Sequence, residues 1–316
     1  MAERQFASWW IALAVVVVAV MAAVPWLLSA YTVSLLISIL AYATLATAWA
    51  VFSGTTRYIS LATAAFVGIG TYTVALLSDH LPLAAVLAIA PLVGFVVALG
   101  VGLSSLRLSG IYFVIFTFGL AELIKQLVIW YEINKTKTLA RYIFVNASGT
   151  LIYGLLLGTA VVVLLGAWWL SRGRLGYALR VIGEDETVAR HTGIDTTRVK
   201  VLVFAATAAV MALVGAVLSL RYTYVDPNIA FNSLVSFQVL IMALLGGIGR
   251  PWGPALGAVP LVLLFELLSG TFPHHFGIAL GICFVVIVYY LPGGVTGLIE
   301  RWPARPWPMP RHRKPS

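Results

Sequence analysis

The sequence predicts an all-α integral membrane protein with about ten transmembrane helices, within a range of about eight to ten, some of them broken or re-entrant. Hydrophobic residues make up 61% of the 316 residues and charged residues only 10%, whereas soluble domains average about 25% charged residues. The mean hydropathy is +1.00. Because one span needs about 20 apolar residues, a chain of this length accommodates about ten spans joined by short loops.

Ten apolar runs are the candidate spans, and they cover residues 9–28, 32–53, 58–78, 82–104, 109–131, 151–171, 201–221, 234–248, 254–272 and 276–292. We interpret the first as a retained span rather than a cleaved signal peptide, because Pro25 and Trp26 fit an interfacial anchor. The third run is interrupted by serine, threonine and glycine, and the eighth is short and ends in glycines. Both are predicted to be broken or re-entrant, which a membrane tolerates only where protein or water covers the backbone.

Basic residues are distributed unevenly between the two sides of these runs. One side holds 15 of the 20 lysines and arginines, in residues 1–8, 54–57, 105–108, 172–200, 249–253 and 293–316. The positive-inside rule places both termini and the loop over residues 172–200 in the cytoplasm. We therefore expect one transmembrane domain over residues 1–300 and a cytoplasmic tail, rich in proline and arginine, over residues 301–316. The net charge of +9 reflects this topology and possible contact with membrane lipids, and not nucleic-acid binding.

The loop over residues 172–200 contains the most polar stretch of the chain, residues 183–195. Asp185 is predicted to cap the start of a short helix, and Gly193 is predicted to adopt the left-handed conformation after its end. Asp195 is predicted to cap the next span. A compact charged helix between two spans is typical of a site that meets a partner in the aqueous phase, although a solvated helix without a partner gives the same pattern.

Glycine-rich segments supply a second group of candidates. We expect Gly68 and Gly70 to break the third span, and a glycine turn separates the eighth span from the ninth. Broken spans can expose backbone groups toward a permeant, whereas tight helix packing is the alternative role of such glycines. The candidate pathway or hinge residues are Thr63, Gly68, Gly70, Gly246, Gly247 and Gly249.

Three ionisable residues fall at membrane depth, where charges are costly and usually face protein or water. Glu122 and Lys125 stand at i and i+3 and can pair on one helix face, while Glu266 lies in the ninth run. They indicate either an ion or proton relay or a self-neutralised pair with one satisfied carboxylate. A relay would make the chain an ion-coupled secondary transporter.

We predict no catalytic residue, metal site or cofactor in this chain. The five histidines are scattered, and the single cysteine, Cys283, lies in an apolar run. The phosphate-binding pattern GxxxxGK[ST] is absent from the sequence, which indicates that the chain has no ATP site of this type.

Five blocks of the chain resemble the permease subunit of branched-chain amino acid ABC importers, the LivM family. These blocks are residues 59–73, 106–122, 179–194, 246–257 and 292–294. In this family the charged loop carries a Glu-Ala-Ala-like motif with a trailing glycine that docks into the cytoplasmic ATPase. Glu186, Ala189 and Gly193 occupy the matching positions, whereas Arg250 stands where the family has a small or hydroxyl residue. The resemblance implies that ATPase coupling involves Glu184, Asp185, Glu186, Ala189, Arg190 and Gly193.

The resemblance also implies a set of partners in the bacterial inner membrane. They are two ATPase subunits that bind ATP and Mg²⁺, a second permease subunit that we expect to complete a heterodimer, and a periplasmic solute-binding protein. The implied cargo is a branched-chain or other hydrophobic amino acid. A urea or short-amide permease is the alternative within the class, and the ion-coupled secondary transporter is the alternative outside it.

Overall fold

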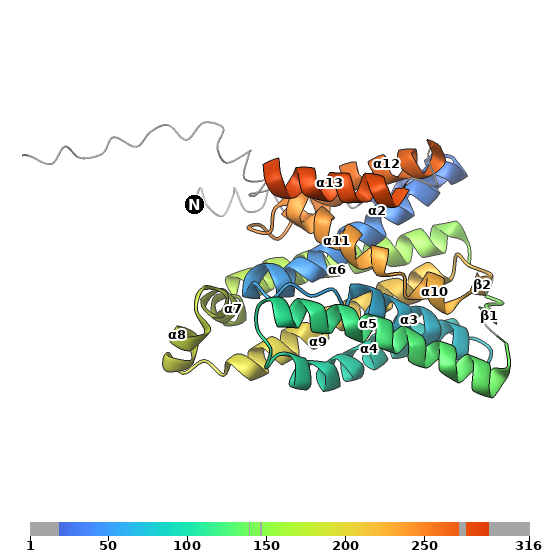
Figure 1. The fold of residues 1–316 in the computed structure, drawn as a ribbon. Coiled ribbons are helices and arrows are strands. Elements are labelled where there is room, and N and C mark those ends of the chain that lie inside the picture. Colours follow the sequence, from blue (N-terminus) through green and yellow to red (C-terminus); the bar gives the residue numbers. More distant parts are fainter. Residues whose placement is uncertain (1–18, 139, 146, 272–275, 291–316) are drawn as a thin grey trace, which may run out of the picture.

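The computed structural model describes residues 19–138, 140–145, 147–271 and 276–290. These residues form a bundle of long helices with one short two-stranded sheet (Figure 1). Seven of the described helices are long and apolar enough to cross a membrane, and two shorter apolar helices accompany them. This agrees with the predicted all-α membrane fold. Most of the first candidate span, residues 292–294 and the tail over residues 301–316 lie outside the described residues.

The described helices follow the predicted apolar runs closely, except that the third begins five residues later, at Thr63, and the seventh begins five residues earlier, at Thr196. The first half of the described chain comprises α2 Ala30–Trp49, the π-helical turn η1 Ala50–Gly54, α3 Thr63–Leu77, α4 Leu83–Ser105, α5 Ile111–Tyr131, the π-helical turn η2 Glu132–Thr136, β1 Arg141–Tyr142 and α6 Gly149–Arg172. The second half comprises α7 Arg174–Glu184, α8 Glu186–His191, α9 Thr196–Ser219, β2 Tyr224–Val225, α10 Pro227–Ala230, α11 Ser233–Gly246, α12 Gly253–Thr271 and α13 Phe276–Tyr290.

Helix α9 forms the centre of the bundle and packs against α2, α3 and α4 (Figure 1). Small residues allow the backbones to approach closely: a Cβ atom at Gly70 would overlap the carbonyl oxygen of Ala212, and one at Gly215 would overlap that of Val67. Van der Waals packing between small residues is a main source of helix association in membranes. On the outside, large apolar side chains such as Ile115 are exposed, as expected for a lipid-facing surface.

The prediction that Gly68 and Gly70 break the third span is wrong. Helix α3 continues through both positions, because a helix satisfies its own backbone groups in apolar surroundings. The ring of Phe231 occupies the space that a Cβ atom at Gly68 would need. Close packing therefore accounts for both glycines, and a hinge or pathway role for them stays a prediction.

The chain is broken instead between η1 and α3, over residues 57–62. Buried side chains of other helices satisfy this segment: the Trp49 Nε1–H donates to the Ser60 carbonyl (2.8 Å), and the Thr117 hydroxyl accepts from the Leu61 N–H (3.0 Å). The Ser236 hydroxyl donates to the Leu61 carbonyl (2.8 Å). These bonds explain how non-helical backbone is tolerated inside a membrane protein. Thr63, a candidate pathway residue, is buried at the start of α3 directly after this segment.

The glycine turn after α11 forms where the sequence predicts it. Gly247 adopts φ +90° at the end of α11, a conformation that favours glycine. A Cβ atom at Gly246 would overlap the carbonyl oxygen of Gly253 at the start of α12. A Cβ atom at Gly249 would meet nothing within 4 Å, so packing does not explain that glycine.

The end of the bundle away from α7 and α8 carries the antiparallel sheet, in which Arg141 pairs with Val225 (Figure 1). The Glu132 side chain is buried there, and its Oε1 lies 3.4 Å from the Arg141 Nε. This sheet was not predicted from the sequence, because strands of two residues show no hydrophobic periodicity.

Candidate functional site at the charged loop

The connection between α6 and α9 forms two helices, α7 and α8, at one end of the bundle (Figure 1). Helix α8 was predicted from the sequence, whereas α7 was not. The signal for α7 was the helical spacing of Ala178, Leu179 and Ile182, which are buried, while Arg174 and Tyr177 are exposed. The charged loop is therefore a two-helix element with an apolar face packed against the bundle.

The predicted N-caps are confirmed. The Asp185 Oδ1 accepts from the backbone N–H groups of Thr187 (2.7 Å) and Val188 (3.2 Å). Hydrogen bonds from the N–H groups of Val188 and Thr187 hold the pKa of Asp185 below its ordinary value. Asp195 caps α9 in the same way, since its Oδ1 accepts from the Arg198 N–H at 3.0 Å.

The predicted C-terminal glycine is confirmed as well. Gly193 has φ +85°, its N–H donates to the Arg190 carbonyl (3.0 Å), and the Ile194 N–H donates to the Ala189 carbonyl (3.1 Å). This pair of bonds is a Schellman motif. The motif fixes where α8 ends and how the chain enters α9.

Glu186 faces the bundle rather than solvent. Both of its carboxylate oxygens accept from the Lys200 Nζ, each at 2.9 Å, and its Oε2 accepts from the Tyr58 hydroxyl at 2.6 Å. Arg190 (2.8 Å) and the Thr196 hydroxyl (3.2 Å) donate to its Oε1. The Lys200 side chain is only 2% exposed, so this carboxylate is the counter-charge that allows a lysine to be buried.

The electrostatics of Glu186 follow from these contacts. Burial alone would raise its pKa, but hydrogen bonds from Tyr58, Lys200 and Arg190, together with the Lys200 charge, lower the pKa to about 2. Burial, and secondarily the hydrogen bond to Glu186, raise the pKa of Tyr58. Glu186 is therefore ionised and Tyr58 protonated throughout the neutral pH range.

The remaining predicted coupling residues divide between the two sides of the loop. The Ala189 side chain is fully buried, whereas Glu184 is exposed and pairs with exposed Arg57 at 2.6 Å. Val188 is 51% exposed and is an apolar side chain on the outer side of α8. Sequence reasoning missed Lys200, for which the only signal was a lysine in the first turn of an apolar span.

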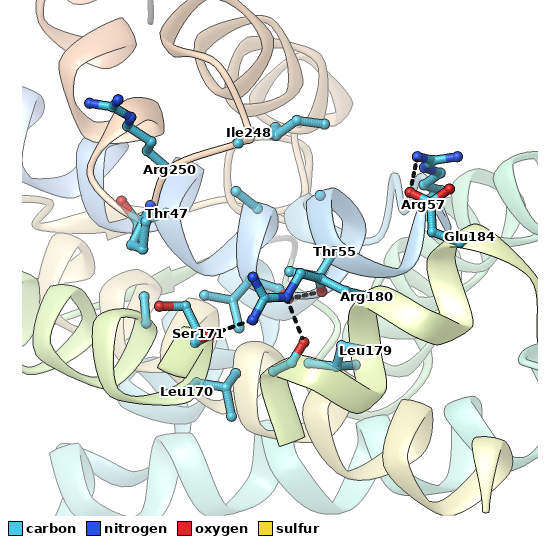
Figure 2. Close-up of a pocket in the computed structure, with 17 residues that line it drawn as sticks. Thr47, Thr55, Arg57, Leu170, Ser171, Leu179, Arg180, Glu184, Ile248 and Arg250 are labelled. Atoms are coloured by element: carbon cyan, nitrogen blue, oxygen red, sulfur yellow. Dashed lines mark hydrogen bonds and ion pairs between the residues drawn. The ribbon is translucent and has the colours of Figure 1, made fainter. Parts of the chain in front are cut away.

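A pocket of about 240 Å³ lies beside α7 (Figure 2). It is enclosed by η1, the last turn of α6, α7 and the turn between α11 and α12, and Arg57, Arg180 and Arg250 are among its lining residues. Nearby, the Lys200 Nζ donates to the Leu106 carbonyl at 3.3 Å. Four of the basic segments therefore meet at one end of the molecule, as the charge distribution predicts. They are residues 54–57, 105–108, 172–200 and 249–253.

The intramembrane charges do not form a chain. The Glu122 Oε1 and the Lys125 Nζ are paired at 2.6 Å on α5. Glu266 is exposed on α12, and Figure 1 shows α5 and α12 on opposite sides of the bundle. The geometry of Glu122 and Lys125 corresponds to the self-neutralised pair, while the role of Glu266 stays a prediction.

Comparison with known proteins identifies the family. Residues 31–291 match the family described as "Branched-chain amino acid transport system / permease component". The chain belongs to this family. It is 28% identical to the high-affinity branched-chain amino acid transport system permease protein LivM of Salmonella typhimurium, over 90% of this chain and 73% of the relative. It is 27% identical to LivM of Escherichia coli, over 86% and 71% respectively, and 30% identical to LivH of the same organism, over 40% and 41%.

No solved structure matches the chain significantly. Family membership confirms the predicted assignment to the LivM-like ABC permeases. The chain is therefore a transport subunit and not an enzyme, and ATP hydrolysis belongs to separate subunits.

Proposed function

We propose that this chain forms part of the membrane pathway of an ATP-driven importer of branched-chain amino acids, and that α7 and α8 pass ATPase movements to the spans. The cargo is supported by the relatives, which are branched-chain amino acid permeases. ATP and Mg²⁺ bind to the partner ATPases, and this chain binds no cofactor. A homologous permease subunit completes a heterodimer.

The observation that supports coupling best is the Glu186 network. The carboxylate on α8 holds Lys200 and Thr196 of α9 and Tyr58 of the non-helical segment before α3. Helix α9 packs against both α3 and α4. A displacement of α8 is therefore transmitted to the centre of the bundle through the ion pair between Glu186 and Lys200. Glu186 is accordingly a positioning residue, and the outer side of α8 around Val188 contacts the ATPase.

The complex lies in the bacterial inner membrane with the α7–α8 end and both termini in the cytoplasm. The accumulation of basic loops at that end supports this orientation. The periplasmic solute-binding protein then docks at the opposite end, where β1 and β2 lie.

The coupling proposal is tested with Val188→Asp in the co-expressed complex. The variant places a carboxylate on an exposed position of α8, so the chain folds normally, while desolvating that carboxylate against the ATPase lowers affinity at least about tenfold. Asn228→Asp is the matched control, because it adds the same charge at an exposed position of α10 at the other end. ATPase retained in pull-downs of the purified permease is the readout. Equal retention by both variants would refute the proposed contact.

The cargo and energy source are tested by uptake of radiolabelled leucine into cells that express the whole complex. We expect uptake to stop on ATP depletion and to be inhibited by excess isoleucine and valine. If only urea or acetamide inhibits uptake, the cargo is a urea or short amide instead. Uptake that survives ATP depletion but collapses with a protonophore would refute an ATP-driven importer.

A further inference from the structure

The pocket beside α7 combines a charged centre with an aliphatic wall (Figure 2). Arg180 of α7 lies at its centre in the view of Figure 2. Val51 of the π-helical turn η1, Leu170, Leu179 and Ile248 are among the apolar residues that line it. Single π-helical turns inside α-helices frequently occur at functional sites.

The guanidinium of Arg180 is held in place by the protein backbone. Its Nε donates to the Gly176 carbonyl (3.2 Å), and one terminal nitrogen donates to the Ser171 carbonyl (2.8 Å) in the last turn of α6. These bonds use two of the five N–H donors of an arginine. Arg180 forms no ion pair with a carboxylate among the described residues, so its charge is not neutralised by the part of the chain that the structure describes.

Two more arginines extend the positive charge around the pocket. Arg57 lines it together with its partner Glu184, and Arg250 lines it from the turn between α11 and α12. Arg250 also lies over the Trp252 ring, with the guanidinium carbon 5.2 Å from the ring centre. The residues that line the pocket therefore include three arginines and one carboxylate, Glu184, and Arg250, which departs from the family pattern, gains a physical role.

The end of α6 indicates the level at which the pocket lies in the membrane. Trp168 and Trp169 are 48% and 71% exposed there, and the Arg172 guanidinium lies 4.2 Å from the Trp168 ring centre. Exposed tryptophans and flanking arginines gather at the level of the lipid headgroups. Leu170 and Ser171 of the same turn line the pocket, so the pocket opens at headgroup level.

We propose that this pocket binds the phosphate headgroup of an anionic phospholipid. Arg180 and Arg250 contact the phosphate oxygens, which suit the planar donor pattern of guanidinium groups. The glycerol and the first acyl carbons lie along Val51, Leu170 and Ile248. The pocket is at the end assigned to the cytoplasm, where anionic lipid headgroups attract basic protein segments. A lipid bound between η1, α6, α7 and the α11–α12 turn would stabilise the packing of α7 and α8 against the spans.

The proposal is tested on the purified full-length complex in nanodiscs of phosphatidylcholine with increasing fractions of phosphatidylglycerol of the same acyl chains. Native mass spectrometry measures retained lipid, and a thermal melt measures stability. We expect phosphatidylglycerol to be retained preferentially. Arg180→Gln and Arg250→Gln should each weaken this preference about tenfold, the loss expected for charged hydrogen bonds. Arg174→Gln is the matched control, because Arg174 is exposed on the same helix but does not line the pocket.

Several outcomes would overturn the proposal. Equal retention of the two lipids would do so, as would an equal effect of Arg174→Gln and the pocket variants. Stabilisation by inorganic phosphate or glycerol 3-phosphate to the same degree as by phosphatidylglycerol would assign the pocket to a free phosphate, and stabilisation by leucine alone would assign it to a carboxylate. Arg180→Gln also removes a cap from α6. If that variant does not fold, Arg250→Gln alone must lower lipid retention for the proposal to stand.

Discussion

Replacing Glu186 by alanine removes the counter-charge of a lysine that is only 2% exposed. Removing one partner of a buried ion pair costs about 3–5 kcal/mol. Lys200 keeps hydrogen bonds to the Tyr58 hydroxyl (3.2 Å) and the Leu106 carbonyl (3.3 Å), and the Glu186 side chain is itself 21% exposed. We therefore expect the lower end of that range, about 3 kcal/mol, which corresponds to a fall in melting temperature of roughly 6–12 °C.

The assay is a thermal melt of the purified permease in detergent, followed by intrinsic fluorescence and size-exclusion recovery. Glu184→Ala is the control on the same loop, because its ion pair with Arg57 is exposed on both sides and should contribute less than about 1 kcal/mol. Lys200→Met in the Glu186→Ala background removes the unpaired charge and should restore much of the lost stability. The reasoning is refuted if Glu186→Ala lowers the melting temperature no more than Glu184→Ala does, or if the second substitution restores nothing.

One further prediction concerns the same carboxylate, and two concern other positions. Because the pKa of Glu186 is lowered from 4.5 to about 2, its contribution to stability is complete above pH 4.5 and is lost as the pH falls from there toward 2; melts over this range should show a shallower decline in Glu186→Gln. Gly70→Ala should destabilise the protein by about 1–3 kcal/mol through overlap with α9, whereas Gly119→Ala, at a position with nothing within 4 Å of the new Cβ atom, should be neutral or stabilising in the same denaturation assay. Glu122→Gln and Glu266→Gln should leave the rate of ATP-driven leucine uptake within about twofold of the parent, since neither belongs to a relay; abolished uptake in properly folded protein would contradict this reading.

The local features of this protein follow from its sequence. Apolar runs of membrane length set the spans, because a helix is the simplest way to satisfy backbone groups in lipid. Asp185, Gly193 and Asp195 set the ends of α8 and α9 through hydrogen bonds to residues two to five positions away. Such bonds depend only on neighbouring residues, so residue type and spacing were sufficient to predict them.

The features that make the charged loop a mechanical element were decided by tertiary structure. Glu186 turns inward because Lys200 and Tyr58, 14 and 128 residues away along the chain, converge on its carboxylate. The third span breaks before α3 rather than at Gly68, because side chains from distant helices satisfy the non-helical backbone there. A single sequence contains no periodicity or local pattern for such contacts. Their free energy depends on burial and on partners that only the folded bundle brings together.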